Sequence, residues 1–254
     1  MSPKLFLATI SILVFSFVAV QQKPALYIIG DSTVKNGDGS GSNGQWGWGS
    51  LVDVYFDTGK ISVRNHAIGG RSSRTFITDG RWDRILQTLQ KGDYVMMQFG
   101  HNDSGPLDDT ARARGTIKGI GNDSIDTYNP IRKQREMVYS YGFYMRRFVN
   151  EAKAKGAIPI ICSPIPRENW KDGRIVRSDY LAWSKQIAEE TGACFIDLQN
   201  MVAQEYEKMD TLQVKQFFPA DHTHTNKQGA ILNAEQVVKG IRALNACDLK
   251  KFLK

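Results

Sequence analysis

A serine, a histidine and a carboxylate in this chain have the residue types of a hydrolytic triad. Ser32 follows an apolar run, residues 25–29, that is typical of a buried strand. Near the other end of the chain, Asp221 and His224 stand three residues apart. Serine is a weak nucleophile unless a histidine accepts its proton and a carboxylate orients that histidine. The three residues therefore predict serine-hydrolase chemistry, although an Asp-Ser pair alone is also ordinary turn chemistry.

Polar groups also follow two other predicted strands. Gly70 lies in a glycine turn after residues 61–67, and Asn102 follows residues 94–99. Open parallel sheets carry their chemistry at the carboxyl ends of the strands. A serine hydrolase needs preorganised donors for the oxyanion, each worth roughly 3–4 kcal/mol. The backbone N–H groups of Ser32 and Gly70 and the side-chain amide of Asn102 are the predicted donors.

Strand and helix patterns alternate along the chain. We expect five strands, at residues 25–29, 61–67, 94–99, 157–162 and 193–198. We expect helices at residues 45–56, 81–90, 136–155, 179–191, 201–209 and 225–244. The polar stretch 104–134 is predicted to be an irregular loop. This pattern predicts one α/β domain with a mainly parallel, doubly wound sheet and helices on both faces.

The composition is that of an ordinary soluble globular protein, with 41% hydrophobic and 23% charged residues. There are 33 Lys and Arg against 26 Asp and Glu, which gives a net charge of +7. Such a balance favours a polyanionic partner. The basic residues are scattered rather than gathered in a stripe, which favours an acidic polysaccharide over nucleic acid. Simple solubility is the alternative explanation of the charge.

The first twenty residues differ from the rest of the chain. Lys4 is followed by an uncharged run, residues 5–20, with small residues near its end. This pattern predicts a signal peptide over residues 1–20, cleaved near Val20 or Gln21, and a mature domain over residues 21–254. A membrane anchor is the alternative, but a span needs ~20 apolar residues and no positive cluster follows the run. We therefore expect a secreted or periplasmic protein without stable membrane association after cleavage.

Three cysteines, Cys162, Cys194 and Cys247, are too few and too scattered for a disulfide framework. One bridge between Cys162 and Cys194 is conceivable if their strands are neighbours. A chain of 254 residues is long enough to be stabilised by its hydrophobic core. We expect the mature protein to be a monomer.

Four sequence blocks carry a resemblance to a known family. They are Gly-Asp-Ser-Thr at 30–33, Asn-His-Ala-Ile-Gly-Gly-Arg-Ser at 65–72, Gly-His-Asn-Asp at 100–103 and Asp-His-Thr-His at 221–224. In these blocks and in their order the chain resembles the SGNH (GDSL-type) hydrolases over nearly its whole mature length. The resemblance implies a flavodoxin-like, three-layer α/β/α sandwich. It also implies Ser32 as nucleophile, His224 as base, Asp221 as orienting group and Ser32, Gly70 and Asn102 as oxyanion donors.

The chain is most similar to the rhamnogalacturonan acetylesterases, through residues 70–72, 99–103 and 218–225. This resemblance implies removal of acetyl groups from a pectic polysaccharide through an acyl-enzyme, without metal or cofactor. The expected partner is an acetylated acidic polysaccharide or oligosaccharide. We expect substrate contacts from Arg71, His101, Arg112, Arg114 and His222. For Arg112 and Arg114 a solvated loop is the alternative.

Three other functions are compatible with parts of the sequence. An SGNH esterase or lipase could act on another acyl ester, such as acetylated xylan or a small ester. A carbohydrate-binding protein could keep the fold without activity, although no catalytic group is missing. His222, His224 and Asp221 also have residue types that bind zinc, but no third histidine or cysteine cluster accompanies them.

Overall fold

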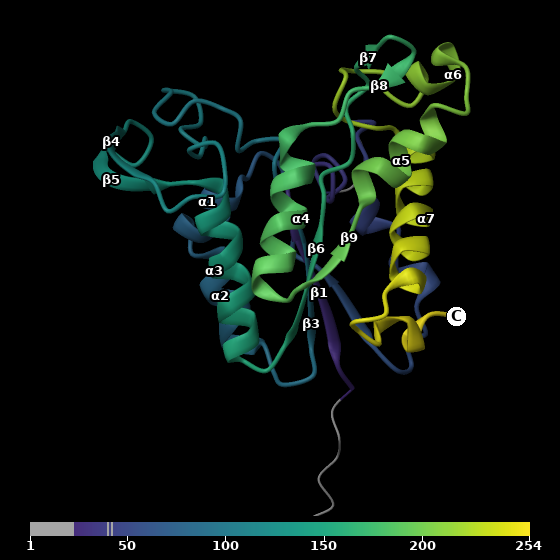
Figure 1. The fold of residues 1–254 in the computed structure, drawn as a ribbon, viewed down its shortest axis with the longest axis horizontal. Helices are drawn as coiled ribbons and strands as arrows, with labels where there is room; N and C mark the ends of the chain where they lie inside the picture. Colours follow the sequence, from purple (N-terminus) through teal and green to yellow (C-terminus); the bar gives the residue numbers. More distant parts are fainter. Residues whose placement is uncertain (1–22, 40, 42) are drawn as a thin grey trace, which may run out of the picture.

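The computed structural model describes residues 23–39, 41 and 43–254, so the predicted signal peptide lies outside the described residues. Five parallel strands form one sheet in the order β2–β1–β3–β6–β9 (Figure 1). They are β1 (Ala25–Gly30), β2 (Ser62–Asn65), β3 (Tyr94–Gln98), β6 (Ile158–Cys162) and β9 (Cys194–Ile196). The five predicted strands are confirmed. Within the described ranges, no helix is long and apolar enough to span a bilayer.

The side chains of β1 alternate between two hydrophobic cores. Leu26 and Ile28 belong to the core on one face of the sheet, whereas Tyr27 and Ile29 belong to the core on the other face. All of these side chains are buried because helices cover both faces. The continuous apolar run that marks β1 in the sequence is the signature of this double burial.

Helices form the two outer layers (Figure 1). One face is covered by α1 (Ser73–Thr78), α2 (Arg81–Thr88), α3 (Tyr141–Ala154) and α4 (Asp179–Thr191). The other face is covered by α5 (Leu198–Tyr206), α6 (Thr211–Lys215), α7 (Lys227–Ala243) and the 3₁₀ helices η1 (Trp48–Ser50) and η3 (Leu249–Phe252). The predicted three-layer α/β/α sandwich is therefore confirmed.

The predicted boundaries are accurate for α4 and nearly so for the start of α7. Helix α4 covers residues 179–191 as predicted, and Gly192 ends it with a φ of 61° that glycine adopts without strain. The last helix begins one residue later than predicted at its N-cap. Asn226, not Thr225, is the cap, and its side chain accepts the backbone N–H of Gly229 at 3.0 Å.

The helix predicted over residues 45–56 is wrong. Two short 3₁₀ helices, η1 and η2 (Asp53–Tyr55), occupy this segment. The chain here lies directly against the backbone of the Ser32 turn: a Cβ on Gly47 would be 2.3 Å from the carbonyl carbon of Val34. The indole of Trp48 is buried and donates to Gln98 Oε1 at 2.9 Å. This close approach decides the local conformation, and apolar spacing does not reveal it.

The helix predicted over residues 136–155 is wrong in its first turn, and the polar stretch before it is not entirely irregular. Strands β4 (Ser124–Asn129) and β5 (Gln134–Tyr139) form an antiparallel hairpin. Helix α3 starts only at Tyr141, because the Ser140 side chain caps it by accepting the N–H of Phe143 at 3.1 Å. A second small hairpin, β7 (Trp170–Lys171) with β8 (Arg174–Ile175), was also not predicted.

The three cysteines are free thiols in this structure. Cys162 and Cys194 lie on neighbouring strands, but they are not opposite each other: Cys162 pairs with Ile196 and Cys194 with Ile160. The interaction of Cys194 is with Cys247 instead, and together with burial it raises the pKa of the Cys194 thiol. The structure thus gives no support to a bridge between Cys162 and Cys194.

Candidate active site

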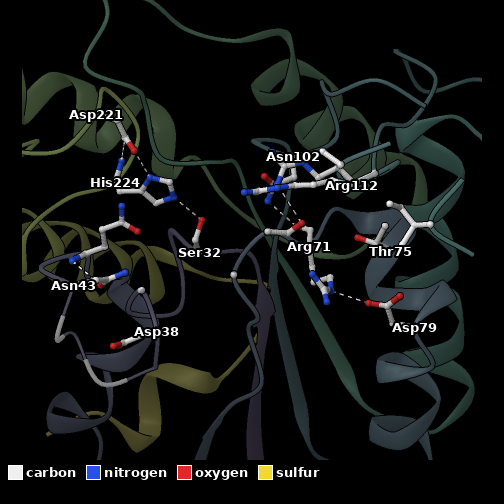
Figure 2. Close-up of a pocket in the computed structure, with 17 residues that line it drawn as sticks. Ser32, Asp38, Asn43, Arg71, Thr75, Asp79, Asn102, Arg112, Asp221 and His224 are labelled. Atoms are coloured by element: carbon white, nitrogen blue, oxygen red, sulfur yellow. Dashed lines mark hydrogen bonds and ion pairs between the residues drawn. The ribbon is translucent and has the colours of Figure 1, made fainter. Parts of the chain in front are cut away.

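The side chains of Ser32, His224 and Asp221 form one continuous chain of hydrogen bonds (Figure 2). Ser32 Oγ lies 2.8 Å from His224 Nε2, and His224 Nδ1 lies 2.7 Å from Asp221 Oδ2. The serine comes from the end of β1, whereas the other two residues come from the loop before α7. With Nδ1–H donating to Asp221, Nε2 is left as the acceptor for the serine proton.

The turn that carries Ser32 is built from the end of β1 and its contact with β3. Asp31 is fully buried, and its Oδ1 accepts the N–H of Thr33 at 2.8 Å. Its backbone carbonyl accepts the N–H of Lys35 at 3.0 Å, which closes the turn. At Gly30 a Cβ would lie 2.7 Å from the backbone oxygen of Gln98, so only glycine fits there. This packing fixes the direction in which Ser32 leaves the sheet.

Asp221 accepts three hydrogen bonds, two from His224 and one from Thr223. Its Oδ2 accepts from the ring, and its Oδ1 accepts the backbone N–H groups of Thr223 at 2.7 Å and His224 at 2.8 Å. Burial opposes the ionisation of Asp221, but these hydrogen bonds outweigh it and hold its pKa below the usual range. The carboxylate is therefore charged near neutral pH, as the orienting group of a histidine must be.

Gly70 and Asn102 line the same cleft as Ser32. Gly70 adopts a φ of 75°, which glycine tolerates best. Asn102 is buried, and its Nδ2 donates to the backbone oxygen of Arg71 at 2.9 Å. A primary amide carries two N–H donors, so the second remains available to a ligand. The structure thus brings together all five residues predicted for the triad and the oxyanion site.

Asp103 lies directly behind Asn102 and is completely buried. It accepts the hydroxyl and the backbone N–H of Ser73, the latter at 3.1 Å. Burial nevertheless raises the pKa of Asp103 to about 7, although these hydrogen bonds favour the charged form. The nearby charge of Asp31 acts in the same direction as burial.

We expect the titration of Asp103 to lower the free energy of unfolding as the pH rises from about 4 to about 8. The unfolded chain releases this proton near pH 3.8, whereas the folded chain keeps it to about pH 7. Between these values the folded state binds more protons, so stability falls with rising pH. Urea unfolding across this window measures the slope, which we expect to be shallower in Asp103→Asn. An equal dependence of the free energy of unfolding on pH in the two proteins would contradict the raised pKa of Asp103.

The cleft has a volume of about 850 Å³ and runs across the carboxyl edge of the sheet. In Figure 2, His224 and Asp221 lie on one side of Ser32, and Arg71, Asn102 and Arg112 lie on the other. Besides the five residues already described, its wall includes Gly37, Asp38, Asn43, Gln45, Gly69, Arg71, Thr75, Asp79, Ala111, Arg112, Arg114 and Ile131. A cleft of this size holds more than one sugar ring.

Arg71, Arg112 and Arg114 all lie in the wall of the cleft, as predicted for substrate contacts. Arg71 pairs with Asp79 at 2.7 Å, and Arg114 donates to the backbone oxygen of Gly70 at 3.3 Å. Neither Arg112 nor Arg114 forms an ion pair with a carboxylate in the described part of the chain. Burial and the charge of Arg112 lower the pKa of Arg114. This excess of positive charge beside Gly70 suits an anionic ligand.

His101 and His222 do not line the cleft, in contrast to the prediction. The His101 ring is buried, with Nδ1 3.3 Å from Asp31 Oδ2 and Nε2 3.0 Å from the backbone oxygen of Ile165. His222 is exposed, and its Nε2 accepts from Arg167 Nη1 at 3.2 Å. Both rings are thus occupied by protein groups and stabilise the loops behind the site.

Several residues of the cleft were not predicted from the sequence. Asp38, Asn43 and Gln45 come from the glycine-rich loop after β1, and Ile131 comes from the turn of the β4–β5 hairpin. The loop composition gave no signal beyond flexibility. The hairpin could have been recognised only by pairing two polar segments that lack strong alternation.

Comparison with known proteins places this site in a family. A profile of the GDSL-like Lipase/Acylhydrolase family matches residues 28–231. The chain belongs to that family. The match includes the Ser32 turn and ends within α7, so it contains every residue of the hydrogen-bonded chain described above. As a GDSL-family hydrolase with this arrangement, the protein is a serine esterase.

Two curated relatives of this GDSL-family chain are similar over most of their length. A rhamnogalacturonan acetylesterase of Emericella nidulans is 31% identical over 219 residues, which cover 85% of this chain and 84% of that protein. A probable rhamnogalacturonan acetylesterase of Bacillus subtilis is 31% identical over 227 residues, which cover 86% of this chain and 93% of that protein.

Two solved structures have the same fold as this GDSL-family chain. Protein YxiM of Bacillus subtilis superposes with a TM-score of 0.69 and 27% identity, covering 87% of this chain and 56% of that one. An acetylxylan esterase from Geobacillus stearothermophilus superposes with a TM-score of 0.57 and 21% identity, covering 89% of this chain and 97% of that one. The sheet order and the layers are thus those of the esterase fold.

Proposed function

We propose that this protein is a secreted carbohydrate esterase that removes acetyl groups from an acidic pectic polysaccharide of the rhamnogalacturonan type. The observation that carries the proposal is the Ser32–His224–Asp221 hydrogen-bonded chain in a cleft whose wall also holds Arg112 and Arg114, neither of which forms an ion pair with a carboxylate among the described residues. The relatives named rhamnogalacturonan acetylesterases support the substrate. Secretion is proposed from the apolar run of residues 5–20 after Lys4.

The proposed reaction has two steps. Ser32 Oγ attacks the acetyl carbonyl carbon while His224 Nε2 accepts the hydroxyl proton. The carbonyl oxygen becomes an oxyanion that accepts the N–H groups of Ser32 and Gly70 and the amide of Asn102. When the C–O bond to the sugar breaks, His224 returns the proton to the sugar oxygen. Water, activated by His224, then cleaves the acetyl-Ser32 ester and releases acetate.

Arg112 and Arg114 give the proposal its preference for an anionic substrate. A uronate carboxylate beside Gly70 would relieve the repulsion between the two guanidinium groups, whose outer nitrogens both lie 3.5 Å from the position of a Gly70 Cβ. Arginine binds a carboxylate through two parallel hydrogen bonds, which a neutral sugar cannot accept in the same way. This part of the wall would therefore recognise the galacturonate units of pectin rather than xylose.

We expect Arg112→Gln to reduce kcat/KM for acetylated rhamnogalacturonan about tenfold more than for a small neutral acetyl ester. One charge-assisted hydrogen bond contributes roughly 1.5–3 kcal/mol, of which solvent screening at an open cleft removes a part. Steady-state acetate release with both substrates measures the ratio. Arg135→Gln is the matched control, because Arg135 is an exposed arginine that pairs with Asp126 and does not line the cleft. An unchanged ratio for Arg112→Gln would remove Arg112 from substrate recognition.

The experiment that tests the proposed substrate is acetate release from acetylated rhamnogalacturonan, acetylated xylan and a small acetyl ester. Release selective for rhamnogalacturonan supports both the acetylesterase activity and the pectic substrate. Activity on xylan or on the small ester alone would leave the esterase and contradict the pectic assignment. No release from any acetyl ester would contradict the function and favour a binding protein.

A further inference from the structure

Arg167 joins the two loops that carry the candidate site, although it does not line the cleft. It lies five residues beyond the end of β6. Its Nη2 donates to the backbone oxygen of His101 at 3.2 Å. Its Nη1 donates to the hydroxyl of Thr223 and to His222 Nε2, the latter at 3.2 Å. One guanidinium group therefore connects the loop of Asn102 with the loop of His224.

The residues around Arg167 strengthen the same connection. The backbone N–H of Glu168 donates to the carbonyl of His222 at 2.8 Å. The carbonyl of Ile165 lies 3.0 Å from His101 Nε2. The segment 165–168 thus contacts both loops through backbone as well as side-chain groups, and it forms a cross-link at the edge of the sheet.

The loop of Asp221 and His224 depends on such contacts because it has no regular secondary structure. The side chains of Asp221 and His224 are 39% and 24% exposed, so the core does not fix them. On one side the loop is held by Thr225, whose backbone oxygen accepts the N–H of Trp46 at 2.8 Å. On the other side it is held at residues 222 and 223 by Arg167 and Glu168.

The chemistry of arginine suits this role. Its planar, rigid fork presents donors in two directions at once, here toward His101 on one side and toward His222 and Thr223 on the other. A guanidinium also stays protonated at any pH at which the protein is folded. Lysine has a single ammonium group on a flexible stem and cannot reach both loops in the same way.

We infer that Arg167 is a positioning residue, which sets the His224 loop against the Asn102 loop and so keeps the base and an oxyanion donor in register around Ser32. Arg167 touches none of the reacting atoms and acts through Thr223, His222 and the backbone of His101. The inference rests on the proposed roles of Ser32, His224 and Asn102. A displacement of about 1 Å in such groups reduces catalysis about 100-fold.

The test compares Arg167→Ala and Arg167→Lys with the wild type on a small acetyl ester. We expect Arg167→Ala to lower kcat between tenfold and 100-fold and to change KM less than twofold. We expect Arg167→Lys to regain part of the loss. The rate at which a fluorophosphonate labels Ser32 should fall with kcat, because it reports the Ser32–His224 geometry without any sugar. A merely structural role would lower the fraction of labelled protein instead, with kcat per labelled site unchanged, and this result would overturn the inference.

Arg177→Ala is the matched control for the loss of a bridging arginine. Arg177 is similarly part-buried and also contacts three groups, donating to Ile175 O, Asn200 Oδ1 and Glu207, but it lies away from the cleft. We expect this variant to keep the wild-type kcat per labelled site. An equal loss of kcat in Arg177→Ala would overturn the specific role of Arg167.

Thr223→Val removes the hydroxyl that accepts a hydrogen bond from Arg167. This variant tests the same contact if Arg167→Ala does not fold. We expect its kcat to fall in the same sense, and the double variant Arg167→Lys/Thr223→Val to be no worse than the poorer single variant. Additive losses would overturn the inference.

If Ser32→Ala kept full activity, the proposed function would fail. If Ser32→Ala is inactive while Arg167→Ala is labelled at the wild-type rate, only the positioning role fails.

Discussion

Replacing Ser32 with alanine is expected to lower kcat for a small acetyl ester by roughly 10⁴-fold or more, because the variant lacks the hydroxyl that is paired with His224 and that would form the acetyl-enzyme. Ser32 Oγ is the oxygen that lies 2.8 Å from His224 Nε2. The side chain makes no other hydrogen bond among those described, so folding should be unaffected. Acetate release and the midpoint of thermal unfolding, measured on the same preparation, separate the two effects.

The control for this substitution is Ser104→Ala. Ser104 lies on the exposed part of the Asn102 loop, where its hydroxyl donates to the backbone oxygen of His101 and to no other group in the described part of the chain. It does not line the cleft. We expect Ser104→Ala to keep most of the wild-type kcat. Activity retained in Ser32→Ala would exclude Ser32 as the nucleophile.

Replacing His224 with glutamine is expected to cause a loss of kcat comparable to that of Ser32→Ala. Without the imidazole, no base is in place to accept the serine proton. No acid is in place to donate a proton to the sugar oxygen. Asp221→Asn should cost about 10⁴-fold, since an amide beside Nδ1 favours the wrong histidine tautomer. Steady-state kinetics over a range of pH measures both variants. A His224→Gln variant within tenfold of the wild type would contradict the assignment of the base.

The strictest test of this second prediction combines the substitutions of Ser32 and His224 in one variant. Because Ser32 and His224 act as one unit, the double variant Ser32→Ala/His224→Gln should be about as active as either single variant. His66→Gln is the control histidine, since its ring stacks on Tyr27 and lies outside the cleft. Multiplied losses in the double variant would mean that the two residues act independently.

The parts of the site that are local in sequence, or fixed by the ends of strands, could be predicted. Asp221 and His224 stand three residues apart in one turn, so their contact required no knowledge of the fold. Ser32, Gly70 and Asn102 follow three parallel strands that are adjacent in the sheet, and adjacent parallel strands end at the same edge. The apolar runs of β1 and β3 are long enough to be recognised in the sequence.

The parts that depend on pairing of distant, weakly patterned segments could not be predicted. The β4–β5 hairpin has a largely polar sequence, and it is anchored by the buried Arg74, which forms an ion pair with Glu136 62 residues away. The non-helical path of residues 45–56 results from contact with the backbone of Val34. Both conformations are determined by tertiary contacts that override local propensity.

The same limit explains why two residues predicted as substrate contacts do not line the cleft. His101 and His222 stand next to the site residues Asn102 and Asp221 in the sequence. In a tight loop, neighbouring side chains point in different directions. His101 consequently points back toward Asp31, and His222 points toward Arg167. The Pro164–Arg167 segment follows β6 at the same edge of the sheet, but it carries no motif, so the sequence does not indicate the role inferred for Arg167.

The central claim of this account is that acetyl groups pass through Ser32, and trapping the intermediate tests it most directly. The wild-type protein is mixed with excess acetyl ester and quenched in acid during turnover, and its peptides are analysed by mass spectrometry. The account predicts an acetyl group on the peptide that contains Ser32, located on that residue by fragmentation and absent from Ser32→Ala. Acetate release without acetylation of Ser32, or an acetyl group on another residue whose replacement abolishes turnover, would contradict it.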